Sequence, residues 1–205
     1  MEKLPAKTVE RLSEYRRTLI NCKNNGKEYI YSHELAQLHH KTAVQVRRDI
    51  MLMGFSGIQR KGYKVSEMID AISRILDCEN GQNVAIVGVG HLGTAILQYF
   101  RGKRPKLNIV ALFDVDKEKT GREINGVPCH HVDELPEVVD RMHIDLGIIT
   151  VPPEFARETA EALINAGVRG LLNLTTIPLR VPEDVFLEEY DMITSLEKVA
   201  YFARS

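Results

Sequence analysis

Residues 83–93 read NVAIVGVGHLG, an apolar run that leads directly into a glycine-rich loop. The unbroken apolar run is typical of a buried parallel strand, and the residues after the loop, 91–101, are predicted to form a helix. A G-x-G-x-x-G pattern between a strand and a helix indicates a dinucleotide-binding unit, because its glycines permit a tight turn, approach to a pyrophosphate and close helix–strand packing. The loop consists of Gly88, Val89, Gly90, His91, Leu92 and Gly93.

A second apolar strand, residues 108–113, ends next to Asp114, which lies 21 residues after Gly93. An acidic residue at this spacing accepts hydrogen bonds from the adenosine ribose, and its charge repels a 2′-phosphate. The sequence therefore predicts NAD(H) as the cofactor rather than NADP(H). CoA or another nucleotide at the same loop, or a purely structural turn, remain alternatives.

Later segments extend the predicted sheet. Strands are expected at residues 145–151 and 170–174, with a helix at 154–166 between them, which is the alternation of a parallel α/β sheet. The turn containing Thr150 and Pro152 comes at the end of a strand, where α/β sheets bind ligands, so it is expected to border the nicotinamide. A last helix is expected over residues 188–205.

The preceding part of the chain is predicted to be mostly helical. Ser32 and Thr42 are expected to cap the second and third helices, and a hairpin with a basic tip is expected before the fourth. This order is the winged form of the helix-turn-helix. The predicted elements are helices at 8–22, 32–38, 42–54 and 66–76, with the hairpin at 57–65.

Charge separates the two halves. Residues 1–78 hold 14 Lys and Arg against 9 Asp and Glu, whereas residues 79–205 hold 13 against 19. A basic half suits a polyanion such as DNA. If Val46 and Ile50 of the predicted recognition helix face the core, then Gln45, Arg48 and Asp49 lie on other faces, where Gln and Arg side chains can contact base edges. A solvated basic helix in a structural bundle is the alternative. The predicted DNA contacts are Thr42, Gln45, Arg47 and Arg48 on the helix and Arg60, Lys61 and Tyr63 on the hairpin.

Composition excludes several classes of protein. The chain has 205 residues, of which 44% are hydrophobic and 27% charged, so it is neither disordered nor fibrous. No apolar run approaches the roughly 20 residues of a membrane span, and three scattered cysteines indicate a reducing compartment, so a cytoplasmic protein is expected. No metal site is expected at residues 129–131 (Cys-His-His), because adjacent residues rarely converge on one ion. No catalytic acid or base is evident either. A small NAD-dependent oxidoreductase and a CoA-binding regulatory module remain alternatives.

Over nearly its whole length the chain resembles the Rex family of redox-sensing transcriptional repressors. The matching stretches include residues 11–17, 45–49, 62–65, 88–93, 113–116, 166–170 and 180–182, together with Asp191. The resemblance implies an α/β chain with a winged helix-turn-helix domain at 1–78 (helix-turn-helix at about 18–57), a Rossmann-type NAD(H)-binding domain at 79–185 and a domain-swapped C-terminal helix at 186–205. It implies a homodimer that binds operator double-stranded DNA, has no membrane partner, and is released when NADH rises relative to NAD⁺.

The resemblance also implies a switch. Asp191 of one subunit would pair with either Arg17 or Tyr99 of the other, and Met192 would lie near the nicotinamide. The chain departs from the family at His91, where Asn is usual, and at the hairpin, where residues 60–63 read RKGY.

Overall fold

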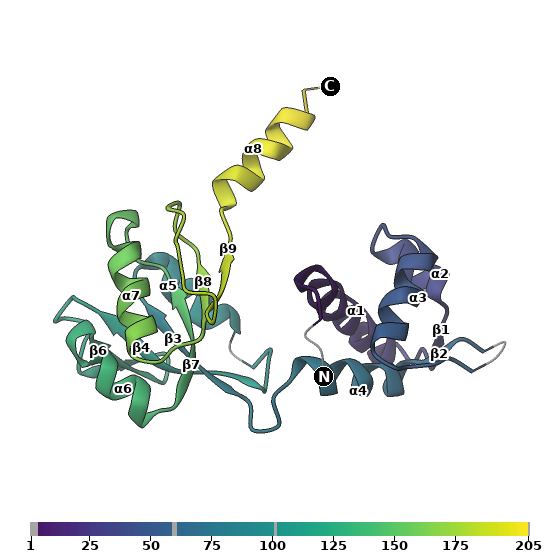
Figure 1. Cartoon of the computed structure of the whole chain (residues 1–205), viewed down its shortest axis with the longest axis horizontal. Helices are drawn as coiled ribbons and strands as arrows, with labels where there is room; N and C mark the ends of the chain where they lie inside the picture. The colour runs from purple at the N-terminus through teal and green to yellow at the C-terminus, as the bar shows by residue number, and fades with distance from the viewer. Residues whose placement is uncertain (1–3, 59–60, 101, 205) are drawn as a thin grey trace. The chain divides into compact units, whose positions relative to one another are not determined.

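The computed structural model describes residues 4–58, 61–100 and 102–204 and divides into two compact units, Met1–Glu79 and Asn80–Ser205 (Figure 1). Each unit has its own hydrophobic core. No helix within the described ranges is long and apolar enough to span a membrane.

The N-terminal unit packs four helices beside a two-stranded sheet. On the first helix the apolar residues Leu12, Tyr15 and Leu19 recur at helical spacing and are fully buried, so one face of that helix enters the core. Met68 and Ile72 of the fourth helix belong to the same core. The elements are α1 (Ala6–Asn24), β1 (Tyr29–Ile30), α2 (Ser32–Leu38), α3 (Ala43–Leu52), β2 (Tyr63–Lys64) and α4 (Val65–Leu76).

The helix order and the hairpin of this unit are confirmed, but the cap of α2 was wrongly predicted. Ser32 is the first helical residue, and the N-cap is Tyr31, whose N–H donates to Glu34 Oε2 at 2.8 Å. A glutamate three residues into a helix can satisfy the cap N–H in this way, which moves the helix start by one residue. The hairpin forms as an antiparallel bridge between Ile58 and Gly62, after which β2 pairs with β1.

The C-terminal unit is a seven-stranded sheet in the order β5-β6-β4-β3-β7-β8-β9, parallel except for β5. Its strands are β3 (Gln82–Val87), β4 (Leu107–Asp114), β5 (Arg122–Ile124), β6 (Val127–His131), β7 (Ile144–Ile149), β8 (Gly170–Asn173) and β9 (Phe186–Glu189). The helices are α5 (His91–Phe100), α6 (Leu135–Arg141), α7 (Ala156–Asn165) and α8 (Met192–Phe202), with short 3-10 turns at Val132–Glu134 and Pro153–Phe155.

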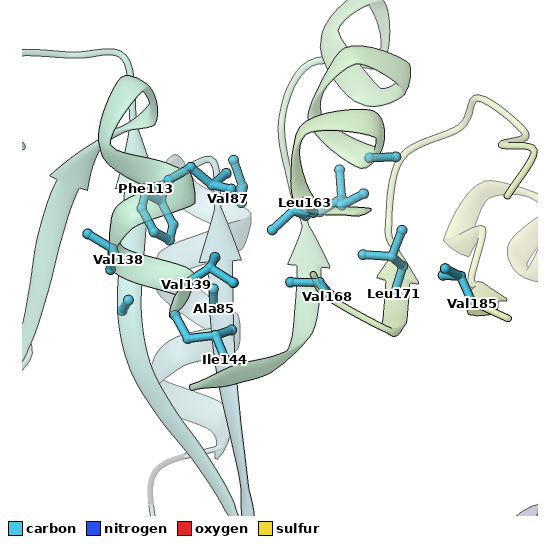
Figure 2. Packing of buried hydrophobic residues seen from close by; sticks show 14 of the residues in the cluster. Ala85, Val87, Phe113, Val138, Val139, Ile144, Leu163, Val168, Leu171 and Val185 are labelled. Atoms are coloured by element: carbon cyan, nitrogen blue, oxygen red, sulfur yellow. The ribbon is translucent and has the colours of Figure 1, made fainter. Parts of the chain in front are cut away.

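Two apolar clusters sandwich the sheet. Alternate residues of the central strands, such as Val87 and Phe113, pack against Val138 of α6 and Leu163 of α7 on one face (Figure 2). Ile86 and the neighbouring residues of the same strands pack against α5 on the other face. Burial on both faces explains why these strands are unbroken apolar runs in the sequence.

The sheet is larger than the sequence analysis predicted. The sequence pattern predicts no element at β5, β6 or α6, and it places Glu188 and Glu189 in the last helix. These two glutamates instead belong to β9, an edge strand that pairs with β8, and the last helix begins at Met192. Charged side chains are common on edge strands because such strands have one unpaired, solvated side.

Candidate functional site

The glycine loop between β3 and α5 lacks room for a side chain at two positions and is open at a third. Gly88 has a φ of +93°, and a Cβ on it would lie 2.8 Å from the carbonyl group of Thr150. A Cβ on Gly93 would collide with the carbonyl oxygen of Gly88. The Cβ position of Gly90, in contrast, has no heavy atom within 4 Å, so a ligand can reach the loop backbone there.

Thr150, the first residue after β7, holds this loop in place. Its hydroxyl donates to the carbonyl oxygen of Gly88 at 2.7 Å and also lies 3.1 Å from that of Val87. Its backbone N–H donates to the Val87 carbonyl oxygen at 2.9 Å. Hydrogen bonds from Thr150 therefore fix the position of the Gly88 carbonyl group at the start of the loop. Pro152 lies exposed in the turn that follows.

The loop ends in the first turn of α5. His91 is exposed and Leu92 half-buried, whereas Val89, two residues after the end of β3, is buried. N–H groups of a first helical turn lack partners within the helix and carry a partial positive charge. Open space at Gly90 next to such a turn is suited to a phosphate group.

Asp114, at the end of β4, is the charged group of the site. It is only 8% exposed, and its Oδ2 accepts from the Val89 N–H at 2.8 Å and from Lys119 Nζ at 3.1 Å. Its Oδ1 accepts from the Asp116 N–H at 3.0 Å. Burial alone would raise the pKa of Asp114, but these three donors outweigh it and hold the pKa below its ordinary value. Asp114 is therefore an anion in the site at neutral pH.

Gly88, Asp114 and Thr150 are neighbours because their strands are in register. Val87 pairs with Phe113 on one side and with Ile149 on the other, so the next residue of each strand lies at the same sheet edge. From β3 the chain proceeds to β4 in one direction and reaches β7 in the other, which makes this edge a topological switch point. The open loop and the buried carboxylate together fit a dinucleotide, with the pyrophosphate at Gly90 and a ribose at Asp114.

The predicted recognition helix is α3, and Thr42 caps it as expected by accepting from the Gln45 N–H at 3.1 Å. Arg47 and Arg48 are exposed, and Arg47 Nη1 lies 3.3 Å from Ser32 Oγ. The helix therefore offers two guanidinium groups to solvent. Gln45 is half-buried, and its side-chain amide donates to Asp49.

The expectation that Asp49 lies on an outer face was wrong. Its carboxylate is fully buried and accepts two bonds of 2.7 Å from Arg11, one of 3.0 Å from Tyr15 and one of 2.9 Å from Gln45. Burial would raise the pKa of Asp49, but hydrogen bonds from Arg11, Gln45 and Tyr15 outweigh it and lower the pKa. A helical wheel treats Asp49 as polar surface because its partners lie 34 and 38 residues away on α1.

The hairpin follows α3. The Lys61 ammonium lies 5.9 Å from the centroid of the Tyr29 ring, and Tyr63 packs its ring against Phe55 at 6.2 Å between centroids. Lys61 is exposed, whereas Tyr63 is half-buried. Arg60, also predicted to contact DNA, lies outside the described residues.

Comparison with known proteins covers both units. The family model described as "CoA binding domain" matches residues 79–177, and the model described as "Putative DNA-binding protein N-terminus" matches residues 3–50. A redox-sensing transcriptional repressor Rex from Exiguobacterium sp. is 36% identical over 98% of this chain and 92% of the relative. The Rex repressor of Listeria welshimeri is 37% identical over 98% and 93%. The chain belongs to the Rex family.

Solved structures of a Rex-family repressor, RSP, are similar to this chain over both units. RSP in complex with β-NAD⁺ and operator DNA has a TM-score of 0.90 and 32% identity, covering 99% of this chain and 94% of that one. RSP in complex with β-NADH has a TM-score of 0.87 and covers 99% and 95%. The curated Rex relatives are named as repressors rather than as oxidoreductases, so the family assignment favours a regulator over the enzyme alternative.

The residues of the switch that the Rex resemblance implies lie on three helices. Arg17 is exposed on α1, and Tyr99 is 59% exposed on α5. Asp191 caps α8, accepting from the Ile193 N–H at 2.8 Å and the Thr194 hydroxyl at 2.7 Å. Those two bonds lower the pKa of Asp191 and keep it charged. Met192 is half exposed beside it.

Sequence reasoning missed Lys119, whose ammonium lies 3.1 Å from Asp114 Oδ2 and 3.6 Å from Asp116 Oδ2. The signal was present as a lysine three residues after Asp116, the spacing at which a turn brings side chains together. Nothing in the spacing alone distinguishes Lys119 from Lys117 on the same turn.

Proposed function

We propose that this chain is a homodimeric, redox-sensing repressor that binds operator DNA through its N-terminal unit and is released when NADH rises relative to NAD⁺. The observation that carries the proposal is the match of 99% of the chain to a Rex-family repressor in complex with NAD⁺ and operator DNA. The open glycine loop and the charged Asp114 supply the chemistry for the nucleotide. Because its target is DNA, we place its action in the cytoplasm.

The residues at the sheet edge would hold NAD(H). The open backbone at Gly90 and the first turn of α5 would bind the pyrophosphate, and Asp114 would accept from the adenosine ribose. Residues of the 150–152 turn and Met192 of a partner subunit would border the nicotinamide. When bound, the nicotinamide supplies the signal, since its ring is a cation when oxidised and neutral when reduced. An apolar neighbour such as Met192 is less unfavourable beside the neutral ring.

The exposed cations of α3 and the hairpin would contact DNA. Arg48 and Lys61 are exposed, and Arg47 is exposed with its Nη1 3.3 Å from Ser32 Oγ, so these cations would bind phosphates or base edges. Thr42 and Gln45, in the first turn of the helix, and Tyr63, on the hairpin, would make further contacts with the DNA. Asp49 binds Arg11 and Tyr15, and through them it fixes the orientation of α3 on α1.

A second copy of the chain would cover α8. No residue of α8 is buried, and six apolar or aromatic side chains on it are half or more exposed. Such a surface is unfavourable in water and typical of an interface. They are Met192, Ile193, Leu196, Val199, Tyr201 and Phe202. We propose that α8 is exchanged between subunits, so that Asp191 reaches the partner, where it pairs with Arg17 in one state and Tyr99 in the other.

Replacing Arg17 tests this switch. Arg17→Ala is expected to leave NADH affinity largely unchanged and to weaken the effect of NADH on DNA binding, because one of the two partners of Asp191 is lost. Titration of operator DNA with and without NADH measures the effect on DNA binding, and calorimetry of NADH with the variant measures NADH affinity. Lys23→Ala, which removes another exposed cation from α1, is the matched control. An Arg17→Ala protein with the NADH response of Lys23→Ala would remove Arg17 from the mechanism.

The function itself is tested by a gel shift on the DNA upstream of this chain's own gene across a series of NADH/NAD⁺ ratios. Binding should be tight at low ratios and should fall as NADH rises. Because phosphate contacts dominate such affinities, all lanes need the same salt concentration. Equal binding at every ratio contradicts the proposal.

CoA is the second candidate ligand, because residues 79–177 match a family model described as a CoA-binding domain. A CoA ligand would also place phosphates at the glycine loop. Competition calorimetry separates the two candidates: NADH should bind in the presence of excess CoA with unchanged affinity if the site is a dinucleotide site.

A further inference from the structure

The carboxylate that would bind the ribose is already largely occupied by donors from the protein. A carboxylate offers about four acceptor positions. In Asp114 three of them are taken, two on Oδ2 by the Val89 N–H and Lys119 Nζ, and one on Oδ1 by the Asp116 N–H. Held in this way, Asp114 has one position left and can accept from one ribose hydroxyl, while a ribose has two.

Lys119 has the complementary capacity. Its ammonium carries three N–H donors, and two of them face Asp114 at 3.1 Å and Asp116 at 3.6 Å. The side chain is 35% exposed, so the third donor is accessible from outside. Its ion pairs with the two aspartates raise the pKa of Lys119 despite partial burial, so that the group is a cation at neutral pH.

We propose that Lys119 is a second contact for the adenosine ribose and the cation that would receive a 2′-phosphate, so that the balance of Asp114, Asp116 and Lys119 sets the discrimination between NADH and NADPH. This inference rests on the proposed binding of NAD(H). It adds a residue that acts opposite to Asp114, because the carboxylate repels a 2′-phosphate while the ammonium attracts it.

The charge balance gives the direction of each effect. Asp114, Asp116 and Lys119 form the corner of the site that would receive the ribose. Together they carry a formal charge of about −1, which disfavours a phosphate. Replacing Asp114 by Asn neutralises the corner and leaves Lys119 less tightly paired. Removing Lys119 as well returns the corner to a net negative charge from Asp116. NADPH binding gained by the first substitution should therefore depend on Lys119.

The experiment is calorimetry of NADH and NADPH with the full-length chain in the Asp114→Asn background. Asp114→Asn alone should bind both nucleotides, with affinities within about tenfold of one another. Adding Lys119→Met should lower NADPH affinity by about tenfold or more and NADH affinity by about threefold, as expected for loss of a charged hydrogen bond. Adding Lys119→Arg instead should preserve NADPH affinity, since a guanidinium also binds phosphate.

Lys117→Met in the same background is the matched control. Lys117 lies on the same turn, is exposed, and has no ion pair within the described part of the chain. It should change the affinities of the two nucleotides equally and by less than about threefold. Identical results for Lys117→Met and Lys119→Met, or absence of NADPH binding by an Asp114→Asn protein that still binds NADH, would overturn the proposal.

Calorimetry of NADH with the wild-type chain, and with Lys119→Met and Lys117→Met in that chain, separates this inference from the function on which it rests. A wild-type chain that does not bind NADH contradicts the proposed function. A wild-type chain that binds NADH, with Lys119 variants that follow the control, contradicts only the role of Lys119. NADH binding by each variant also shows that it is folded.

Discussion

Asp49 in the N-terminal unit and Asp114 in the C-terminal unit are both buried carboxylates with lowered pKa values, but their surroundings differ. Asp49 is fully enclosed, and all four of its acceptor positions are filled by Arg11, Tyr15 and Gln45. Asp114 is slightly exposed at a sheet edge and has one acceptor position free. A saturated carboxylate can only hold the fold, whereas an unsaturated one can also bind a ligand.

Removing Asp49 should have the largest effect in the molecule. Asp49→Ala leaves the buried Tyr15 hydroxyl without its acceptor and the Arg11 guanidinium with the Thr8 hydroxyl in place of a carboxylate, so the free energy of unfolding should fall by about 3 kcal/mol or more. Chemical denaturation of the full chain followed by circular dichroism measures this. Asp70→Ala, at an exposed position of α4, is the control and should change stability by less than about 0.5 kcal/mol. Equal stabilities of the two variants would show that the Asp49 network is not structural.

Removing Asp114 should affect NADH binding more than stability, in contrast to the effect of removing Asp49. Asp114→Ala is expected to lower NADH affinity by about tenfold or more, since its charged hydrogen bond to the ribose is lost, and to relax discrimination against NADPH. Its effect on unfolding should be smaller than that of Asp49→Ala, because two of the three donors left behind, the Asp116 N–H and the Lys119 ammonium, belong to partly exposed residues. Calorimetry and denaturation of the same preparation test both halves of this expectation. A large loss of stability with unchanged NADH affinity would place Asp114 with Asp49 as a structural group.

The comparison also shows what sequence can predict. The glycine loop, Asp114 and the apolar strands were predictable because their signals are local in sequence. Asp49 was misplaced because its partners on α1 are distant in sequence, so a helical pattern could not reveal its burial. Lys119 was missed because only the folded turn distinguishes it from Lys117.

The hairpin of β5 and β6 was missed for a different reason. Asn125 and Gly126 both have positive φ, +50° and +79°, and form the two-residue turn that an Asn-Gly pair favours. The local signal was therefore in the sequence. The flanking strands are only three and five residues long and have no clear apolar alternation. The Asn-Gly pair alone therefore did not predict a hairpin.

Acid should destabilise both carboxylate sites, and the sign follows from their lowered pKa values. A group whose pKa is lower in the folded state contributes stability above its unfolded pKa, near 4, and that contribution is lost as the pH falls through the folded value. The unfolding free energy should therefore fall below about pH 4. Asp49→Asn should flatten this dependence, and a denaturation series from pH 7 to pH 3 measures it. An unchanged slope would show that Asp49 does not titrate with folding.

The smallest expected effect separates two roles of Gln45. Gln45 donates one of the four bonds to Asp49 and also lies on the proposed DNA-binding helix. Gln45→Ala should lower the free energy of unfolding by about 1 kcal/mol, the value of one hydrogen bond at a half-exposed side chain. With one donor fewer, the folded pKa of Asp49 rises, so acid unfolding should begin at a higher pH than in the wild type. Arg48→Ala removes an exposed side chain from the same helix and should weaken DNA binding with neither change. If Gln45→Ala weakens DNA binding while stability and acid unfolding stay at wild-type values, Gln45 acts on DNA directly and the Asp49 network is complete without it.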